Sequence, residues 1–117
     1  MILKPEVRDE GVCREIWYAL GVADALYQQM TRQLVVTSLK DSHDDKPLSL
    51  HNQGRACDLR TRDLPMSQTE ALRAKLSQLL EPLGFDVVLE QSPQHLHVEF
   101  DPKNNETFFK RLEVPKT

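Results

Sequence analysis

Apolar residues recur at helical spacing in two stretches of the chain. Between residues 12 and 30 they form one stripe, with Trp17 and Val22 close to it. The stripe consists of Ile16, Leu20, Ala23 and Tyr27. We expect this stripe to lie in the core. Gly21 costs the helix about 1 kcal/mol relative to alanine, which indicates close packing at that position.

The second helical stretch, residues 67–84, has recognisable ends. Ser67 and Glu70 match the S-x-x-E capping box that opens many helices. Pro82 and Gly84 close the segment. The stripe expected in the core consists of Leu72, Leu76, Leu79 and Leu83, widened by Leu80.

Four shorter stretches have the composition of strands. Residues 33–39 are rich in β-branched side chains, and residues 85–90 and 95–100 form a hairpin around a turn that contains Pro93. In residues 56–62 the side chains must alternate between two faces. One face carries Ala56, Asp58, Arg60 and Arg62, and the other carries Cys57, Leu59 and Thr61.

The order helix, strand, strand, helix, strand, strand predicts an α+β fold, in which a small and mostly antiparallel sheet packs against two main helices. The length of 117 residues fits a single domain, residues 1–117. We expect a loop over the polar residues 40–50 and a short helix around residues 107–112.

Composition and charge exclude some classes of function. Hydrophobic residues make up 39% of the chain and charged residues 28%, which is typical of a soluble globular domain. The net charge of −3 gives no electrostatic reason to expect nucleic acid as a partner. We find no signal peptide and no apolar run of about 18 residues, so we expect synthesis in the cytoplasm and no membrane span.

The two cysteines, Cys13 and Cys57, do not have the spacing of a disulfide framework. We expect both to be reduced thiols that pack as small apolar groups. Cys57 is adjacent to Asp58 and is therefore a conceivable zinc ligand. In a strand, however, Cys57 points to the opposite face from Asp58.

The histidines and one aspartate suggest a metal site. His51 and Asp58 are separated by a segment in which Gly54 permits a tight turn or a close backbone approach. His95 and His97 are two residues apart in a strand, so both point to one face. Zinc prefers histidine nitrogen and carboxylate oxygen, and a catalytic site keeps one position for water. Three ligands around one ion are therefore expected here.

Two motifs carry a family resemblance. The segment "SLHNQGRACD" fits the pattern S-x-H-x-x-G-x-A-x-D, and "HLHVEF" contains H-x-H. Together they resemble the M15 zinc peptidases, which include D-alanyl-D-alanine carboxypeptidases and peptidoglycan endopeptidases, some of them phage endolysins. The Hedgehog signalling domain shares their fold. The resemblance covers roughly residues 35–100, and the two motifs are specific only in combination.

The resemblance implies roles for individual residues. His51, Asp58 and His97 would be the ligands of one Zn²⁺ ion. His95 would stay beside the ion and help to stabilise the reacting groups. Ser49 would form a hydrogen bond that positions the loop or the ligands.

The general base departs from the commonest pattern of that family. Many members have an acidic residue three positions before the last zinc histidine, where this chain has Gln94. Glu90, at the end of the partner strand, is the candidate replacement, and His95 is the alternative. Glu99 is a third candidate, displaced about 7 Å along the strand from His97.

The substrate contacts depart from the pattern as well. Family members usually carry an arginine after the strand that precedes the first motif, and here the nearest cation is Lys40. A lysine is a point charge that cannot bind a carboxylate in the two-pronged fashion of arginine. We expect Lys40, Ser49 and Arg55 to contact the substrate, with Arg60 as a further candidate. His43 is interpreted as a solvated loop residue rather than part of the site.

The resulting prediction is a zinc metallopeptidase of the D-alanyl-D-alanine carboxypeptidase or endopeptidase type. Its partner would be a peptidoglycan stem peptide, which is implied by the resemblance alone. It would act as a monomer and reach the cell wall after holin-type export or lysis. The bond that is cut stays open. Two other classes also stay open, namely a non-catalytic zinc-binding module of the same fold and a metal-free interaction domain.

Overall fold

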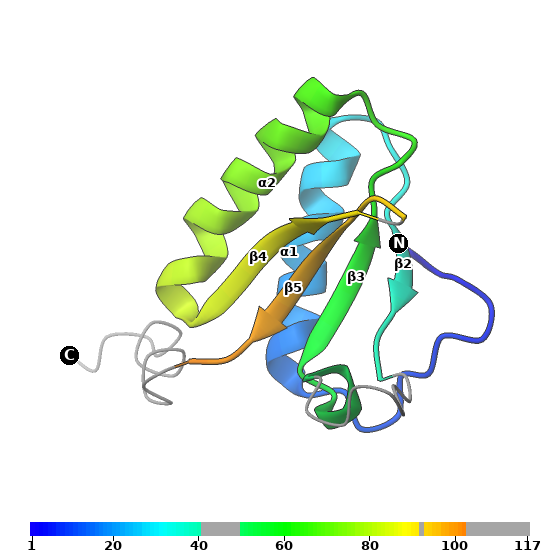
Figure 1. Ribbon diagram of the computed structural model, residues 1–117, viewed down its shortest axis with the longest axis vertical. Coiled ribbons are helices and arrows are strands. Elements are labelled where there is room, and N and C mark those ends of the chain that lie inside the picture. Colours follow the sequence, from blue (N-terminus) through cyan, green and yellow to red (C-terminus); the bar gives the residue numbers. More distant parts are fainter. Residues whose placement is uncertain (41–49, 92, 103–117) are drawn as a thin grey trace.

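The fold is an α+β domain with one five-stranded sheet and two helices (Figure 1). The structure, a computed structural model, describes residues 1–40, 50–91 and 93–102. The expected loop with His43 and Ser49 and the expected helix at 107–112 lie outside the described residues. The α+β prediction is confirmed.

The sheet runs in the order β1-β2-β3-β5-β4. Its strands are β1 (Ile2–Leu3), β2 (Val35–Ser38), β3 (Ala56–Arg60), β4 (Phe85–Glu90) and β5 (His95–Phe100). The pair β1 and β2 is parallel, and the other pairs are antiparallel. The sequence did not reveal β1, because two residues are too few to show an alternating pattern.

Helix α1 (Arg14–Gln29) buries the stripe that its spacing predicted. All four stripe residues are at most 2% exposed. The prediction of close packing at Gly21 is wrong, because a Cβ atom built there would meet nothing within 4 Å. Gly21 lies on the exposed side of the helix, so its cost to the helix has no packing contact to offset it.

Helix α2 (Met66–Leu80) begins and ends earlier than its sequence pattern predicted. Its N-cap is Pro65, so Ser67 already lies inside the first turn, and the helix start carries no side-chain cap among the described residues. The capping-box prediction is therefore wrong, and Glu70 instead accepts hydrogen bonds from Arg73. A short 3-10 turn, η2 (Glu81–Leu83), and Gly84 with a φ of 101° follow the helix.

The leucine stripe of α2 is narrower than predicted. Leu72, Leu76 and Leu80 are spaced by four residues and are buried, whereas Leu79 is 41% exposed. Leu83 is buried from η2 rather than from the helix itself. The contact of α2 with the sheet is mainly with β4, so only one line of residues is covered.

The core lies between the helices and one face of the sheet. Cys57 and Leu59 of β3 and the even-numbered residues of β5 belong to the same buried cluster as the helix stripes. Because side chains alternate along a strand, Asp58 and the odd-numbered residues of β5 point to the other face. We call the face that carries Asp58, Glu90, His95, His97 and Glu99 the polar face.

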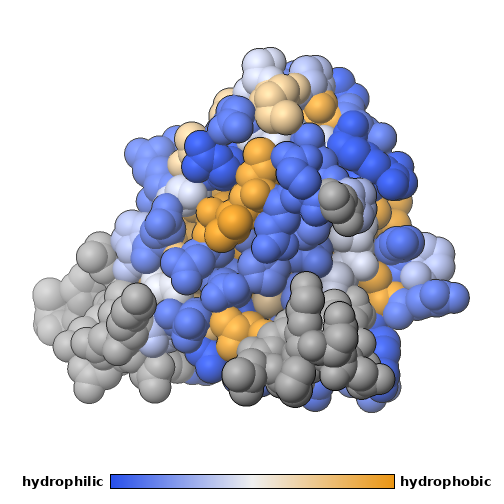
Figure 2. All heavy atoms as spheres, in the orientation of Figure 1, coloured by the Kyte–Doolittle hydropathy of each residue, from blue (hydrophilic) through white to orange (hydrophobic). Residues whose placement is uncertain are grey.

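Figure 1 shows α1 behind the sheet, so the viewer looks onto the polar face. In the same orientation, Figure 2 shows a mostly hydrophilic surface with apolar residues in small separate groups. Within the described ranges, neither helix has the length and apolar character needed to cross a membrane.

Candidate metal centre

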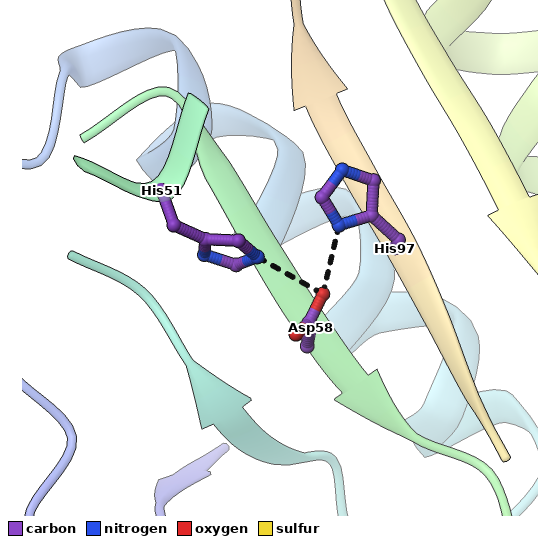
Figure 3. Close-up of side chains that lie close together, drawn as sticks. All are labelled: His51, Asp58 and His97. Atoms are coloured by element: carbon purple, nitrogen blue, oxygen red, sulfur yellow. Dashed lines mark hydrogen bonds and ion pairs between the residues drawn. The ribbon is translucent and has the colours of Figure 1, made fainter. Parts of the chain in front are cut away.

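Three side chains from three elements converge on the polar face (Figure 3). Asp58 lies on β3, and His97 lies directly opposite it on β5 because the two strands pair in that register. His51 comes from a short 3-10 turn, η1 (Leu50–Gln53), that precedes β3. One ligand atom from each of the three lies within 4.8 Å of the others.

Both imidazole rings point at the same carboxylate oxygen. His51 Nε2 lies 3.3 Å from Asp58 Oδ1, and His97 Nδ1 lies 2.9 Å from it. The ring centroids are 5.2 Å apart with an angle of 62° between the planes. The rings therefore meet edge to face and present one nitrogen each to a common point.

The outward nitrogen of each ring is held by an acceptor. His51 Nδ1 donates to the Leu39 carbonyl at 2.6 Å, and the Ser38 hydroxyl lies 3.2 Å from the same nitrogen. His97 Nε2 donates to Glu99 Oε1 at 2.8 Å. Metal-binding histidines almost always donate their second ring N–H to a carbonyl or carboxylate, which fixes the tautomer and the ring orientation. Both histidines follow this arrangement.

A cation fits the centre of this group. Each ring has an acceptor at both nitrogens, so a proton or a metal ion must lie between the inward nitrogens and Asp58. Two imidazolium protons and one Zn²⁺ ion carry the same charge. Two nitrogens and one carboxylate oxygen with a position left for water are a usual donor set for catalytic zinc. The residues present therefore fit a zinc ion.

The pKa values follow from the same contacts. Burial opposes the charged form of His97, but hydrogen bonds to Asp58 and Glu99 outweigh it and raise its pKa to about 9. Burial likewise opposes a charge on His51, and Asp58 outweighs it, so the pKa of His51 is raised. Burial also opposes ionisation of Asp58, yet its hydrogen bonds with the two histidines hold its pKa well below the ordinary value.

Gly54 allows His51 to reach the sheet, as predicted. Its φ is 70°, a conformation that favours glycine, and a Cβ atom there would overlap the carbonyl of Gly11. The Gly54 carbonyl accepts from Cys13 N at 2.9 Å, and Gly54 N donates to the His51 carbonyl at 3.0 Å. The turn is thus fixed between the start of α1 and η1. His51 itself is only 4% exposed.

Glu90 and His95 form a pair beside the three candidate ligands. The hairpin register places them opposite each other, and His95 Nε2 lies 3.0 Å from Glu90 Oε1. The same nitrogen lies 3.8 Å from Asp58 Oδ1. His95 Nδ1 donates to the Pro93 carbonyl at 2.6 Å. The structure therefore brings the two predicted catalytic residues next to the candidate metal centre.

Glu99 and Gln94 have other contacts. Glu99 binds the outward nitrogen of His97, on the opposite side of the ring from Asp58. Such a contact suits a group that orients His97 better than one that receives a proton from water. The Gln94 amide donates to Thr61 Oγ1 at 3.1 Å and so fixes the hairpin turn.

The predicted substrate residues that the structure describes have contacts away from the candidate ligands. The Arg55 guanidinium donates to the Phe100 carbonyl at 3.0 Å and lies 3.6 Å from Asp101. The Lys40 ammonium packs close to Gly11. Arg60, on the polar face, pairs with Asp63 at 2.9 Å. Ser49 lies outside the described residues, so its role stays a prediction.

Cys57 faces the core, as the strand alternation predicted. Both cysteines are free thiols. Burial raises the pKa of the Cys57 thiol well above its ordinary range. Cys57 is therefore not placed as a ligand. The Leu39 carbonyl is the contact that the sequence analysis missed, because a backbone acceptor has no residue signature.

Comparison with known proteins places the chain in a family. The family model of the Hedgehog amino-terminal signalling domain matches residues 11–99, which include every residue of the candidate metal centre. Searches of curated proteins and of solved structures each gave no match. A match over most of the chain, with the α+β fold and the His, Asp and His side chains brought together, agrees with a fold that is related to zinc peptidases. The chain belongs to the Hedgehog amino-terminal signalling domain family.

Proposed function

We propose that this domain is a zinc-dependent hydrolase that cuts a peptide bond in peptidoglycan stem peptides. The observation that carries the proposal is the position of the Glu90–His95 pair, whose imidazole nitrogen lies 3.8 Å from Asp58 Oδ1. A domain that only stored or displayed a metal would not need an acid–base pair at that place.

His51, Asp58 and His97 would hold the ion, with the Leu39 carbonyl and Glu99 fixing the two rings. When bound, Zn²⁺ supplies a Lewis acid that activates water near neutral pH. The buried position of His51 and the low pKa of Asp58 keep this ligand set ordered and the carboxylate ionised.

Glu90 is the proposed general base. Its side chain is 46% exposed, so it can contact both water and substrate. It would accept the proton of the attacking water and then deliver it to the leaving amine. His95, held by the Pro93 carbonyl, would donate a hydrogen bond to the negative charge that develops on the substrate carbonyl. His95 is the alternative base.

The substrate class rests on the resemblance of the two motifs to M15 peptidases. We propose that Lys40, Ser49 and Arg55 contact the stem peptide, and that the domain acts as a monomer. In the structure Arg55 donates to the Phe100 carbonyl, lies over the Phe100 ring and shares its charge with Asp101, so it would have to exchange these contacts for the peptide. Because peptidoglycan peptides contain carboxylates, the positive charges of Lys40 and Arg55 are suited to the substrate.

A second candidate is a non-catalytic zinc-binding module. The observation in its favour is that the matched family model describes a signalling domain rather than a peptidase. The same ligands would then hold zinc without turnover.

The test is digestion of purified cross-linked peptidoglycan, with mass spectrometry of the fragments. Wild-type protein with zinc should release defined peptides. Glu90→Gln should keep its tightly bound zinc and lose about 10²–10⁴-fold of the turnover, the usual contribution of a general base. Asp86→Asn removes a neighbouring carboxylate from the same strand and face, and it should remain active.

The outcomes separate the candidates. If Glu90→Gln stays active and His95→Ala is inactive, His95 is the base. If wild-type protein binds zinc tightly and releases no peptides, the zinc-binding module is correct and the hydrolase is wrong.

A further inference from the structure

Glu90 and His95 form a second group of metal-ligand atoms together with Asp58. One ligand atom from each of these three residues lies within 4.8 Å of the others. His95 Nε2 is 3.0 Å from Glu90 Oε1 and 3.8 Å from Asp58 Oδ1. One imidazole nitrogen and two carboxylate oxygens are a donor set that zinc accepts.

The backbone keeps this group in place. Asp58 lies opposite His97, and Glu90 lies opposite His95, in one continuous antiparallel register across β3, β5 and β4. The His95 ring is oriented from outside the group, because its Nδ1 donates to the Pro93 carbonyl at 2.6 Å. That contact leaves Nε2 as the nitrogen directed at both carboxylates.

The charge of the polar face favours a further cation. Asp86 lies opposite Glu99 in the register, so four carboxylates occupy this face of three adjacent strands. They are Asp58, Asp86, Glu90 and Glu99. Arg60 is the cation of β3 on this face, and its charge is already paired with Asp63 at 2.9 Å.

We propose that Asp58, Glu90 and His95 form a second, weaker Zn²⁺ site that shares Asp58 with the first and inhibits the enzyme when it fills. Asp58 would contribute a ligand atom to both ions. The second site is weaker because it has one histidine, because Glu90 is 46% exposed, and because the first ion repels the second.

The inhibition part rests on the proposed function. A zinc ion held by Glu90 and His95 would occupy the carboxylate lone pair that otherwise accepts a proton, and would take the place of the Nε2 proton that otherwise donates to the substrate. Zinc at one equivalent would therefore support hydrolysis, and excess zinc would suppress it.

The experiment is a zinc titration followed by equilibrium dialysis and elemental analysis, with a chromophoric chelator as competitor. Wild-type protein should bind two equivalents in two classes, one tight and one weaker. The double variant E90Q/H95A should keep the tight equivalent, which also shows that it is folded, and lose the weaker one. Asp86→Asn is the matched control, because it removes a carboxylate from the same face outside the group, and it should bind two equivalents.

One zinc equivalent at saturation in wild-type protein would overturn the second site. So would a weaker class that persists in E90Q/H95A. The two proposals fail in different ways. Active protein that binds one equivalent, with no suppression by excess zinc, overturns only the second site, whereas protein without a tight class overturns the proposed function and the second site together.

Discussion

At the scale of single residues, the site is defined as much by the outward ring nitrogens as by the inward ones. His51 and His97 each have an acceptor behind the ring, and these are a backbone carbonyl and a carboxylate, respectively. A carboxylate behind an imidazole raises its basicity and fixes its tautomer. Glu99 is therefore expected to affect metal affinity without touching the ion.

Replacing Glu99 tests that role. Glu99→Ala should weaken zinc binding by about 10–100-fold, because the orienting hydrogen bond to His97 is lost. Glu99→Gln keeps an acceptor oxygen without the charge and should restore part of the affinity. The measurement is zinc affinity by chelator competition, with Asp86→Asn as the control at the opposite position on β4. Equal affinities for Glu99→Ala and wild-type protein would show that His97 does not depend on Glu99.

The meeting of the three candidate ligands was predictable from the sequence, and the groups that orient them were less so. His51, Asp58 and His97 follow from spacing, from strand alternation and from the motif resemblance, and the structure brings them together. Glu99 was identified as a candidate base, and its contact with the outward nitrogen of His97 depends on side-chain geometry that the spacing leaves open. The Leu39 carbonyl could not be predicted, because every residue carries one.

At the scale of elements, the hairpin of β4 and β5 determines where Glu90 and His95 lie. Its turn is tied to the end of β3 by the Gln94 amide, which donates to the buried Thr61 hydroxyl at 3.1 Å. A carboxylate at this position could accept from the Thr61 hydroxyl, but it could not donate to the Thr61 carbonyl, which the Gln94 amide approaches at 3.5 Å. The glutamine therefore has a structural role at the position where many M15 members carry the base.

Removing that amide should destabilise the domain. Gln94→Ala should lower the free energy of unfolding by about 1 kcal/mol, the usual net contribution of one hydrogen bond. Chemical denaturation followed by circular dichroism measures the difference. Gln28→Ala is the control, because the Gln28 bond to Asp24 is exposed and its loss should change stability by less than about 0.5 kcal/mol. If Gln94→Ala is as stable as wild-type protein, the hydrogen bond from Gln94 to Thr61 does not stabilise the hairpin.

Elements with a hydrophobic pattern that extends over many residues were predicted correctly. Errors arose where the backbone conformation of a single residue sets an element's end. The stripe of α1 and the hairpin are confirmed. The start of α2 was misplaced because a match to the capping-box pattern does not show whether Ser67 has the extended N-cap backbone that the box requires. Leu79 was misplaced because a helix at one side of a sheet buries a narrower line than a heptad-like stripe suggests.

At the scale of the whole molecule, protons and a bound zinc ion would compete for the same nitrogens of His51 and His97. In the folded, metal-free protein the pKa of His97 is raised to about 9, above its unfolded value of about 6.5. The contribution of the charged His97 ring to the free energy of unfolding is therefore at its full value below pH about 6.5. This contribution is lost as the pH rises through 9. Asp58, whose pKa is lowered, stays ionised throughout this window.

Zinc affinity should rise with pH, whereas the stability of the metal-free protein falls. The ion needs deprotonated imidazoles, so its affinity should rise with pH between about 6.5 and 9, by roughly tenfold per pH unit for each proton displaced. The shift in Tm caused by zinc should therefore grow across this window, while the Tm of the metal-free protein falls. Differential scanning calorimetry with and without zinc measures both trends. His97→Ala should flatten them, and a zinc-induced shift that does not change with pH would contradict the competition.

The fold class was predictable because the order of elements and their periodicity depend on the whole chain rather than on single residues. The parallel strand β1 adds an edge without changing that class. Membership of the Hedgehog amino-terminal signalling domain family agrees with it.

The alternation along β5 has a consequence for how this protein can change over time. Leu96, Val98 and Phe100 contribute to the buried cluster, while His95, His97 and Glu99 belong to the polar face. One six-residue segment thus carries core packing and candidate metal-site residues on alternate positions. Substitution at the odd-numbered positions would alter the candidate metal site and leave the apolar packing of the even-numbered side chains in place. Under the two candidate functions proposed above, a hydrolase and a non-catalytic zinc-binding module would therefore differ by only a few side chains on one strand face.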